Sequence, residues 1–274
     1  MPTVRSHDGL DLAHLHIRGD QPSILAVHAT GFCKELWLPI LADLPWDRVM
    51  MDQRGHGLSG VGPRPFDWTD LGRDVLSVAD AVTADARIGL GHSSGGAALV
   101  LAESMRPGTF DAMVLIEPII LPPPRARADD DPLTVGALRR RPSFGSRAAA
   151  LESFHGRGPF VSWDDAVLDA YVGHGFADVD GRWTLRCAPE TEAEYYATAY
   201  VHDAWERLPD VTCPVLLLAG ADTTAPIAHV LEEHADRLGA GTLRLVAGHG
   251  HFLPMERPDL VRRTVEEAVA LASG

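Results

Sequence analysis

Short apolar runs recur along the chain, and segments with helical spacing separate them. Most runs are continuous rather than alternating, which is typical of strands covered on both faces of a parallel sheet. The first run alternates and predicts an antiparallel hairpin at one edge. The succession of strands and helices predicts an α/β fold with a doubly wound, mostly parallel sheet. The apolar runs lie at 10–17, 23–29, 48–52, 87–91, 112–118, 214–220 and 242–248.

The middle of the chain, residues 122–209, has a different pattern. It opens with PPPRARADDDP, whose prolines exclude a helix interior and a central strand, and it continues with helical patches. Eleven of the 18 aromatic residues lie here, and a segment of this size would bury them most economically against a neighbouring domain. We therefore expect a helical cap, or lid, inserted into a core domain formed by residues 1–121 and 210–274. A second domain with its own core is the alternative.

Composition and charge narrow the class of protein. The chain has 274 residues, of which 46% are hydrophobic and 23% charged, close to the average of soluble globular proteins. The net charge of −14 disfavours nucleic acid and anionic membrane surfaces as partners. No apolar run approaches the length of a membrane span, and the first residues lack the pattern of a signal peptide. We expect a cytoplasmic protein and leave its oligomeric state open.

The three cysteines give no sign of a disulfide framework or a metal site. Cys33, Cys187 and Cys213 are far apart in the sequence, and none belongs to a Cys-x-x-Cys pair. Free thiols agree with a reducing compartment. The sequence therefore predicts neither a bound metal nor another cofactor.

A serine stands at a tight junction between a predicted strand and a predicted helix. Residues 91–95 read GHSSG and match the pattern G-x-S-x-G, which carries weight because an apolar run precedes it and an alanine-rich segment follows it. Gly91 and Gly95 lack the side chains that such a turn would exclude. The turn would expose the Ser93 hydroxyl at the carboxyl edge of the sheet, so we predict a nucleophile there. A helix cap is the alternative role for Ser93.

A nucleophilic serine needs a base, and the segment GHGHFLPMERP supplies one. His251 follows the last predicted strand at the same edge of the sheet, and His249 is the alternative. The base in turn needs a carboxylate to orient it. Asp222 follows one predicted strand, and Glu117 ends another that is otherwise wholly apolar. Glu117 therefore requires a partner if it is buried, and both carboxylates are candidates.

An oxyanion intermediate would need two backbone donors. The N–H of Ser94 lies at the predicted start of the helix, where free N–H groups point toward the serine. The loop HATGF at 28–32 follows another predicted strand, and Gly31 lets this loop come close. We therefore predict an oxyanion hole formed by Thr30 and Ser94.

Together these segments resemble the α/β-hydrolase superfamily. The resemblance covers the core domain and rests on HATGF, DQRGHGLSG, GHSSGG, GAD and GHGHFLPMERP, which occur in the superfamily's order. It implies a catalytic triad of Ser93, His251 and an acid. It also implies that Asp52 and Arg54 of DQRGHGLSG brace the loop beside the serine. The oxyanion loop departs from the usual pattern at Ala29, where glycine is more common.

The acid of the triad has two candidates under this resemblance. Asp222 stands in the acid turn GAD, which is one residue shorter than usual. Some members of the superfamily use a glutamate after the sixth strand instead, and Glu117 matches that position. Counting back from Pro226 still places Asp222 at the acid position, so Asp222 is the preferred candidate and Glu117 is the alternative.

The serine determines which chemistry of the superfamily is expected. Dehalogenases and epoxide hydrolases of this fold need an aspartate nucleophile, whereas a serine implies acyl transfer through an acyl-enzyme. We expect a carboxylic-ester hydrolase, of esterase or lactonase type, that acts on a small and largely apolar molecule under the aromatic cap. The alternatives are carbon–carbon hydrolysis of a diketone-like compound, cofactor-free oxygen chemistry, and a non-catalytic receptor for a small ligand. The identity of the substrate stays open.

Overall fold

The computed structural model describes residues 2–84, 86–123 and 126–273, and within them it contains one sheet of eight strands. The strand order is β1-β2-β4-β3-β5-β6-β10-β11. β2 is antiparallel to β1 and β4, and the other neighbours are parallel. The predicted mostly parallel sheet is therefore confirmed. The strands are β1 (Thr3–Arg5), β2 (Asp11–Ile17), β3 (Asp20–Val27), β4 (Trp46–Met51), β5 (Arg87–His92), β6 (Ala112–Ile116), β10 (Val215–Gly220) and β11 (Gly241–Val246).

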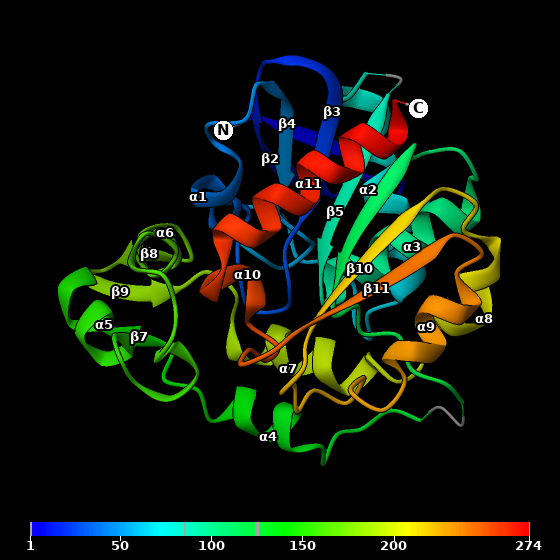
Figure 1. Ribbon diagram of the computed structural model, residues 1–274. Helices are drawn as coiled ribbons and strands as arrows, with labels where there is room; N and C mark the ends of the chain where they lie inside the picture. The colour runs from blue at the N-terminus through cyan, green and yellow to red at the C-terminus, as the bar shows by residue number, and fades with distance from the viewer. Residues whose placement is uncertain (1, 85, 124–125, 274) are drawn as a thin grey trace.

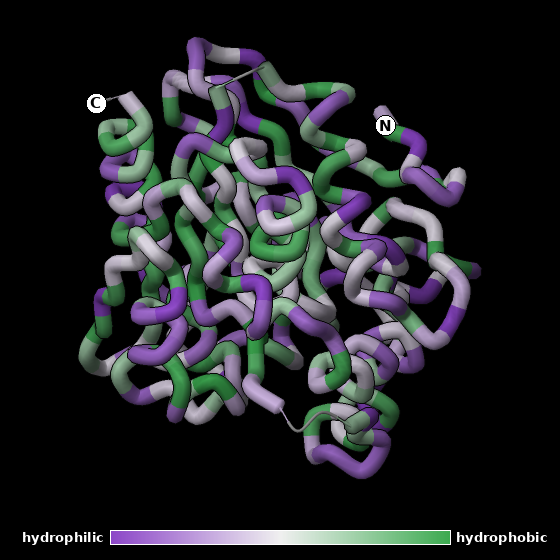
Figure 2. The backbone as a smooth tube through the Cα atoms, turned by 90° about the vertical axis from the view of Figure 1, so that its right-hand side faces the viewer, coloured by the Kyte–Doolittle hydropathy of each residue, from purple (hydrophilic) through white to green (hydrophobic). Residues whose placement is uncertain are grey.

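Helices cover both faces of this sheet, and the central strands are apolar on both faces for that reason. In β3, Leu25 belongs to the apolar layer under α2 and α3, and its neighbour Ile24 to the layer under α1 and α11. Figure 2 shows the hydrophobic segments gathered in the middle of the molecule. No helix in the described ranges is both long and apolar enough to cross a bilayer. The helices of this part are η1 (Lys34–Trp37), α1 (Leu38–Leu41), α2 (Trp68–Val82), α3 (Ser94–Met105), α9 (Leu231–Arg237), α10 (Leu253–Glu256) and α11 (Pro258–Ala272).

The segment between β6 and β10, which we call the inserted segment (residues 122–209), lies beyond the carboxyl ends of the parallel strands. Figure 1 shows it in green and yellow below and to the left of the sheet, while both chain termini lie at the top. Tyr195 and Trp205 join the apolar layer under α3, and Phe144 and Tyr171 join a third layer that also contains Phe32 of the sheet domain. Its helices are α4 (Pro132–Leu138), α5 (Arg147–Phe154), η2 (Gly158–Phe160), α6 (Asp165–His174), α7 (Pro189–Thr198), α8 (Ala204–Arg207) and η3 (Leu208–Asp210).

The inserted segment is not purely helical, which corrects the expectation from sequence. It contains a second sheet of three short strands in the order β7-β9-β8, namely β7 (Ser143–Phe144), β8 (Phe176–Val179) and β9 (Arg182–Leu185). Asp180 and Gly181 turn the chain between β8 and β9 with positive φ angles of 52° and 76°. Asp-Gly is a strong signal for a two-residue hairpin turn, so the sequence did carry evidence for this hairpin.

Candidate active site

Ser93 occupies a sharp turn between β5 and α3. Its φ and ψ angles are 53° and −114°, a region that costs free energy for a residue with a side chain. Surrounding hydrogen bonds hold it there, because the Ser93 N–H donates to the Ile116 carbonyl at 2.9 Å and the Ser93 carbonyl accepts from Ile119 N at 3.2 Å. Strain that is fixed by its surroundings in this way is characteristic of functional sites.

The glycines around Ser93 permit a close approach between α3 and the sheet. A Cβ atom on Gly95 would overlap the carbonyl oxygen of Val27 at the end of β3, and a Cβ atom on Gly91 would lie 2.7 Å from the Cα atom of Gly96. Neither overlap can be relieved by moving a side chain, since the obstructing atoms belong to the backbone. The glycines therefore bring the amino end of α3 against the loop that follows β3.

His251 and Glu117 form a short hydrogen bond beside this turn. His251 Nδ1 lies 2.6 Å from Glu117 Oε2, and Glu117 is completely buried directly after β6. Glu117 Oε1 accepts from Gly220 N at 2.9 Å and Oε2 accepts from Thr223 Oγ1 at 2.7 Å. These partners compensate for the burial of the carboxylate. With its proton on Nδ1, the imidazole presents Nε2 as a free proton acceptor.

The structure does not bring Asp222 to His251, which corrects the preference for Asp222. Asp222 is exposed, and its carboxylate has no hydrogen bond to any described residue, while its N–H donates to the His249 carbonyl at 3.0 Å. The physical reason is the shortened turn after β10. Thr223 N donates back to the Gly220 carbonyl, so the turn closes before the Asp222 side chain can point toward the imidazole.

His249 is engaged elsewhere. Its Nδ1 lies 2.7 Å from Glu256 Oε2, and Glu256 Oε1 accepts from Ser162 Oγ of the inserted segment at 2.6 Å. His92 instead supports His251, because its Nε2 donates to the His251 carbonyl at 2.9 Å. Between the alternatives left by the sequence, the geometry therefore favours His251 as the base.

Ser93 and His251 are linked through His92 and have no direct hydrogen bond among the described residues. The rings of His92 and His251 have centroids 5.0 Å apart, and Ser93 directly follows His92 in the chain. Both residues lie in the described part of the chain, and no hydrogen bond joins their side chains there. Such contacts are often long before substrate binds and tighten in the complex.

The two predicted oxyanion donors both have free backbone N–H groups. Thr30 and Ser94 are buried, and neither N–H has an acceptor among the described residues. The loop that carries Thr30 is held in place through the next residue, Gly31, whose N–H donates to His56 Nε2 at 2.9 Å. Burial lowers the pKa of His56 to about 3, which keeps this nitrogen an unprotonated acceptor. Free N–H groups at a helix start and in a neighbouring loop are available to a ligand oxygen.

Gln53 connects the two halves of this oxyanion region, a role that the sequence interpretation missed. Its Nε2 donates to the His28 carbonyl at 2.6 Å and to Ser94 Oγ at 2.9 Å. The signal lies in DQRGHGLSG, where the family resemblance implies a bracing role for the charged residues. These residues do form ion pairs: Asp52 pairs with Lys34 at 2.7 Å, and Arg54 pairs with Asp74 at 2.7 Å.

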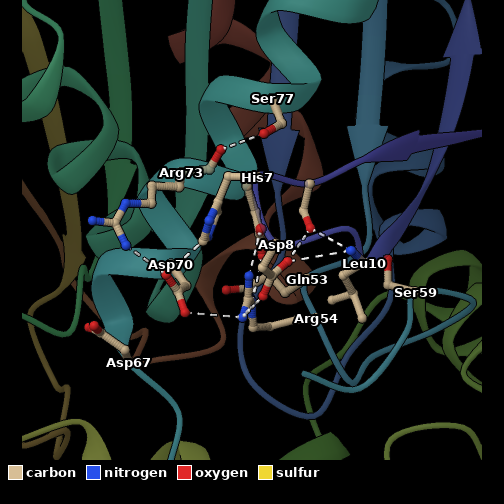
Figure 3. A network of polar contacts seen from close by, with 12 residues as sticks. His7, Asp8, Leu10, Gln53, Arg54, Ser59, Asp67, Asp70, Arg73 and Ser77 are labelled. Carbon is tan, nitrogen blue, oxygen red and sulfur yellow. Dashed lines mark hydrogen bonds and ion pairs between the residues drawn. The ribbon is translucent and has the colours of Figure 1, made fainter. Parts of the chain in front are cut away.

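Arg54 anchors the loop to α2 and to the amino-terminal hairpin. It donates to both carboxylate oxygens of Asp74, at 2.7 and 2.8 Å, and reaches Asp8 and Asp70 at 3.3 Å. Figure 3 shows this network, with His7 beside Asp70. His7, Asp8 and Asp74 have the spacing of metal ligands, but the Arg54 guanidinium already donates hydrogen bonds to both carboxylates. A hollow of about 680 Å³ near His7 also lies away from Ser93, between β1 and α2.

Comparison with known proteins identifies the family. A sequence profile of the alpha/beta hydrolase family matches residues 24–264. Esterase YbfF of Escherichia coli is 25% identical over 222 residues, which cover 79% of this chain and 80% of the esterase. The crystal structure of E-2-(acetamidomethylene)succinate hydrolase superposes with a TM-score of 0.85 at 21% identity and covers 98% of both chains. The enol-lactonase of Burkholderia xenovorans superposes with a TM-score of 0.72 at 20% identity and covers 98% of this chain and all of the lactonase. The fold, the family profile and the arrangement around Ser93 agree, and the chain belongs to the alpha/beta hydrolase family.

Proposed function

We propose that this protein is a serine hydrolase that cleaves a small carboxylic ester or lactone through an acyl-enzyme. The observation that carries the proposal is the hydrogen bond between His251 and the buried Glu117 carboxylate, next to a serine held in a strained turn. An esterase among the relatives and an enol-lactonase among the structural neighbours support the same class of reaction.

In the proposed first half-reaction, Ser93 Oγ attacks the substrate carbonyl carbon and His251 Nε2 accepts the hydroxyl proton. The carbonyl oxygen becomes an oxyanion, which accepts hydrogen bonds from the N–H groups of Thr30 and Ser94. The intermediate collapses, the bond to the alcohol oxygen breaks, and His251 returns the proton to that oxygen. The products are an alcohol and an acyl-Ser93 ester, or a ring-opened acyl-enzyme if the substrate is a lactone.

In the second half-reaction, His251 removes a proton from water, which attacks the acyl carbon. The resulting oxyanion uses the same two donors, and its collapse releases the acid and restores the Ser93 hydroxyl with the proton from His251. Throughout both halves, Glu117 holds the Nδ1–H tautomer of His251 and stabilises the transient imidazolium. A carboxylate bound by three hydrogen-bond donors suits this role because its orientation is fixed.

A fluorophosphonate probe tests this proposal and separates an enzyme from a receptor. The probe should modify Ser93, and Ser93→Ala should remove both the modification and ester turnover while leaving the unfolding midpoint nearly unchanged. Ser104→Ala is the matched control: this serine lies near the other end of α3, its hydroxyl donates only to the Leu101 carbonyl of the same helix, and the variant should still be labelled. If intact wild-type protein resists the probe, the serine is not an activated nucleophile and the hydrolase proposal fails. Product analysis on esters, lactones and diketones then distinguishes the reaction types.

A further inference from the structure

An arginine and a glutamate of the inserted segment lie against the proposed oxyanion loop. Arg140 follows α4, and Glu192 belongs to α7, which packs against α4. A Cβ atom built on Gly31 would lie 2.9 Å from Glu192 Oε1 and 3.3 Å from Arg140 Nη1. Gly31 directly follows Thr30, one of the two proposed oxyanion donors. The ion pair therefore lies beside the residue that follows Thr30, whose N–H would bind the oxygen of the reacting carbonyl.

The guanidinium of Arg140 keeps unused donors. Its Nη1 donates to Glu192 Oε2 at 2.5 Å, and its Nη2 donates to the Tyr171 hydroxyl. A guanidinium has five N–H groups, so Nε–H and one N–H on each terminal nitrogen have no acceptor among the described residues. Burial opposes the charged form, but Tyr171 and Glu192 outweigh burial and raise the pKa of Arg140 above its ordinary value. Arg140 is therefore a cation that can still donate.

A second pair, Arg127 with Glu194 of α7, serves as a comparison, and we call it saturated because each of its three guanidinium nitrogens donates to a carboxylate. Arg127 donates to both oxygens of Glu194, at 2.8 and 2.9 Å, and its Nε donates to Asp129 at 2.8 Å. All three of its nitrogens thus have a carboxylate partner. Its side chain is 40% exposed, whereas that of Arg140 is 21% exposed. Arg127 has the contacts of a structural clamp. Arg140 differs from it because its Nε–H has no acceptor among the described residues and because it lies beside the proposed oxyanion loop.

The unused donors of Arg140 suit an anion with two oxygen acceptors. Guanidinium groups bind carboxylates with two parallel hydrogen bonds, and such charge-assisted bonds are stronger than neutral ones. A molecule with a net charge of −14 repels anionic substrates at long range, so a substrate carboxylate would need direct hydrogen bonds, which the free N–H groups of Arg140 can donate. We propose that Arg140 binds a carboxylate of the substrate, so that the substrate is an ester or lactone that also carries a free carboxylate.

This inference rests on the proposed function and changes the substrate class expected from the aromatic composition. Phe144, Tyr171 and Phe176 belong to the third apolar layer and are buried in it. These rings therefore stabilise the inserted segment itself. Their abundance does not imply a wholly apolar substrate, and the free donors of Arg140 are the more specific indication.

Two matched esters test the subsite. They are p-nitrophenyl hydrogen adipate, which carries a carboxylate, and its methyl ester, which does not. For the acid, Arg140→Met should raise KM at least about tenfold with kcat changed less than about threefold. For the methyl ester, the change in KM should be at least about tenfold smaller than for the acid, and the unfolding midpoint of the variant shows that it is folded. Arg127→Met, which removes the saturated clamp, should affect the two esters equally.

A binding measurement separates failure of this inference from failure of the proposed function. Calorimetric titration of Ser93→Ala with the same two esters requires no turnover. The acid should bind at least about tenfold more tightly than the methyl ester, and adding Arg140→Met should remove the difference while Arg140→Lys should remove only part of it. Equal affinities for the two esters, or equal losses in Arg140→Met and Arg127→Met, overturn the subsite. A wild-type protein that binds the acid selectively but resists the fluorophosphonate probe would keep the subsite and refute the hydrolase.

Discussion

At the scale of single residues, the acid of the proposed triad could come from either of two neighbouring loops, the one after β6 or the one after β10. β6 and β10 are adjacent strands, so a side chain at the end of either could reach His251. Glu117 does so from a fully buried position with φ of 43°. Asp222 is held in a turn that closes too early. The path of the loop after β10 therefore decides which carboxylate contacts His251. This contact predicts which carboxylate substitution should inactivate the protein.

Exchanging the two carboxylates for amides tests this assignment. Glu117→Gln should lower kcat by about 10⁴, the loss seen when a triad acid becomes an amide and the wrong histidine tautomer results. Asp222→Asn should change kcat by less than about threefold, because the carboxylate is exposed and unpaired. Steady-state kinetics on one ester with both variants measures the difference. A large loss in Asp222→Asn together with a small one in Glu117→Gln would reverse the assignment.

The acid of the triad also shows which part of the site could not be predicted from the sequence. Ser93 and His251 were predicted because their motifs encode local geometry, namely a turn that excludes side chains and a loop directly after a strand. Glu117 could be nominated, since a carboxylate on an apolar strand needs a partner. Choosing between Glu117 and Asp222 required the distance across two loops, which no local pattern contains. The same holds for Gln53, whose contacts join segments 41 residues apart in sequence.

At the scale of elements, the strands were predictable in proportion to their burial and length. Each of the seven apolar runs became a strand of the main sheet, and the central strands β3, β5, β6 and β10 are buried on both faces, whereas the edge strand β11 is only partly buried. β1 has three residues and β7 has two, too few to show any period. β8 and β9 are four residues each, with buried, half-buried and exposed positions in no clear alternation, so only their Asp-Gly turn could have revealed them.

The junction between β5 and α3 gives an element-scale prediction. Gly95→Ala should destabilise the fold by about 1–3 kcal/mol, because the new Cβ would overlap the Val27 carbonyl oxygen. It should also lower kcat, since the required shift moves the Ser94 N–H away from the oxyanion site. Urea unfolding and steady-state kinetics measure the two effects.

Gly136 of α4 provides the matched control for this substitution. A Cβ atom there would meet nothing within 4 Å, so Gly136→Ala should raise stability by about 0.5–1 kcal/mol through helix propensity and unfolded-state entropy. It should leave kcat unaltered. If Gly95→Ala behaved like Gly136→Ala in both measurements, the close approach of α3 to β3 would not be required.

At the scale of the whole molecule, several histidines are buried in the neutral form. Burial lowers the pKa of His234 to about 4 and that of His56 to about 3, and it lowers the pKa of His28 and His92 as well. The unfolded chain binds these protons near the ordinary histidine pKa of about 6.5, and the folded protein does not. The contribution of these histidines to the free energy of unfolding is therefore fully present above pH 6.5. It is lost as the pH decreases toward the pKa values of the folded protein.

His234 allows this acid sensitivity to be assigned to one residue. Its Nε2 donates to the Ile120 carbonyl at 2.7 Å, and its buried Nδ1 has no partner among the described residues. Protonation would place a charge on Nδ1 without an acceptor, so the folded state resists it. Between pH 6.5 and about 4, the free energy of unfolding of His234→Gln should depend on pH less steeply than that of wild type. The difference should approach one proton, or about 1.4 kcal/mol per pH unit.

Urea unfolding of both proteins at several pH values measures the two slopes, and taking their difference removes the contribution of the carboxylates, which is common to both. Gln keeps an amide that can donate to the Ile120 carbonyl, so a constant loss of stability from imperfect packing shifts the curve without changing its slope. His174→Gln is the control: that side chain is exposed and is solvated in both states, so its removal should leave the slope as in wild type. Parallel curves for wild type and His234→Gln would mean that the acid sensitivity arises at the other buried histidines.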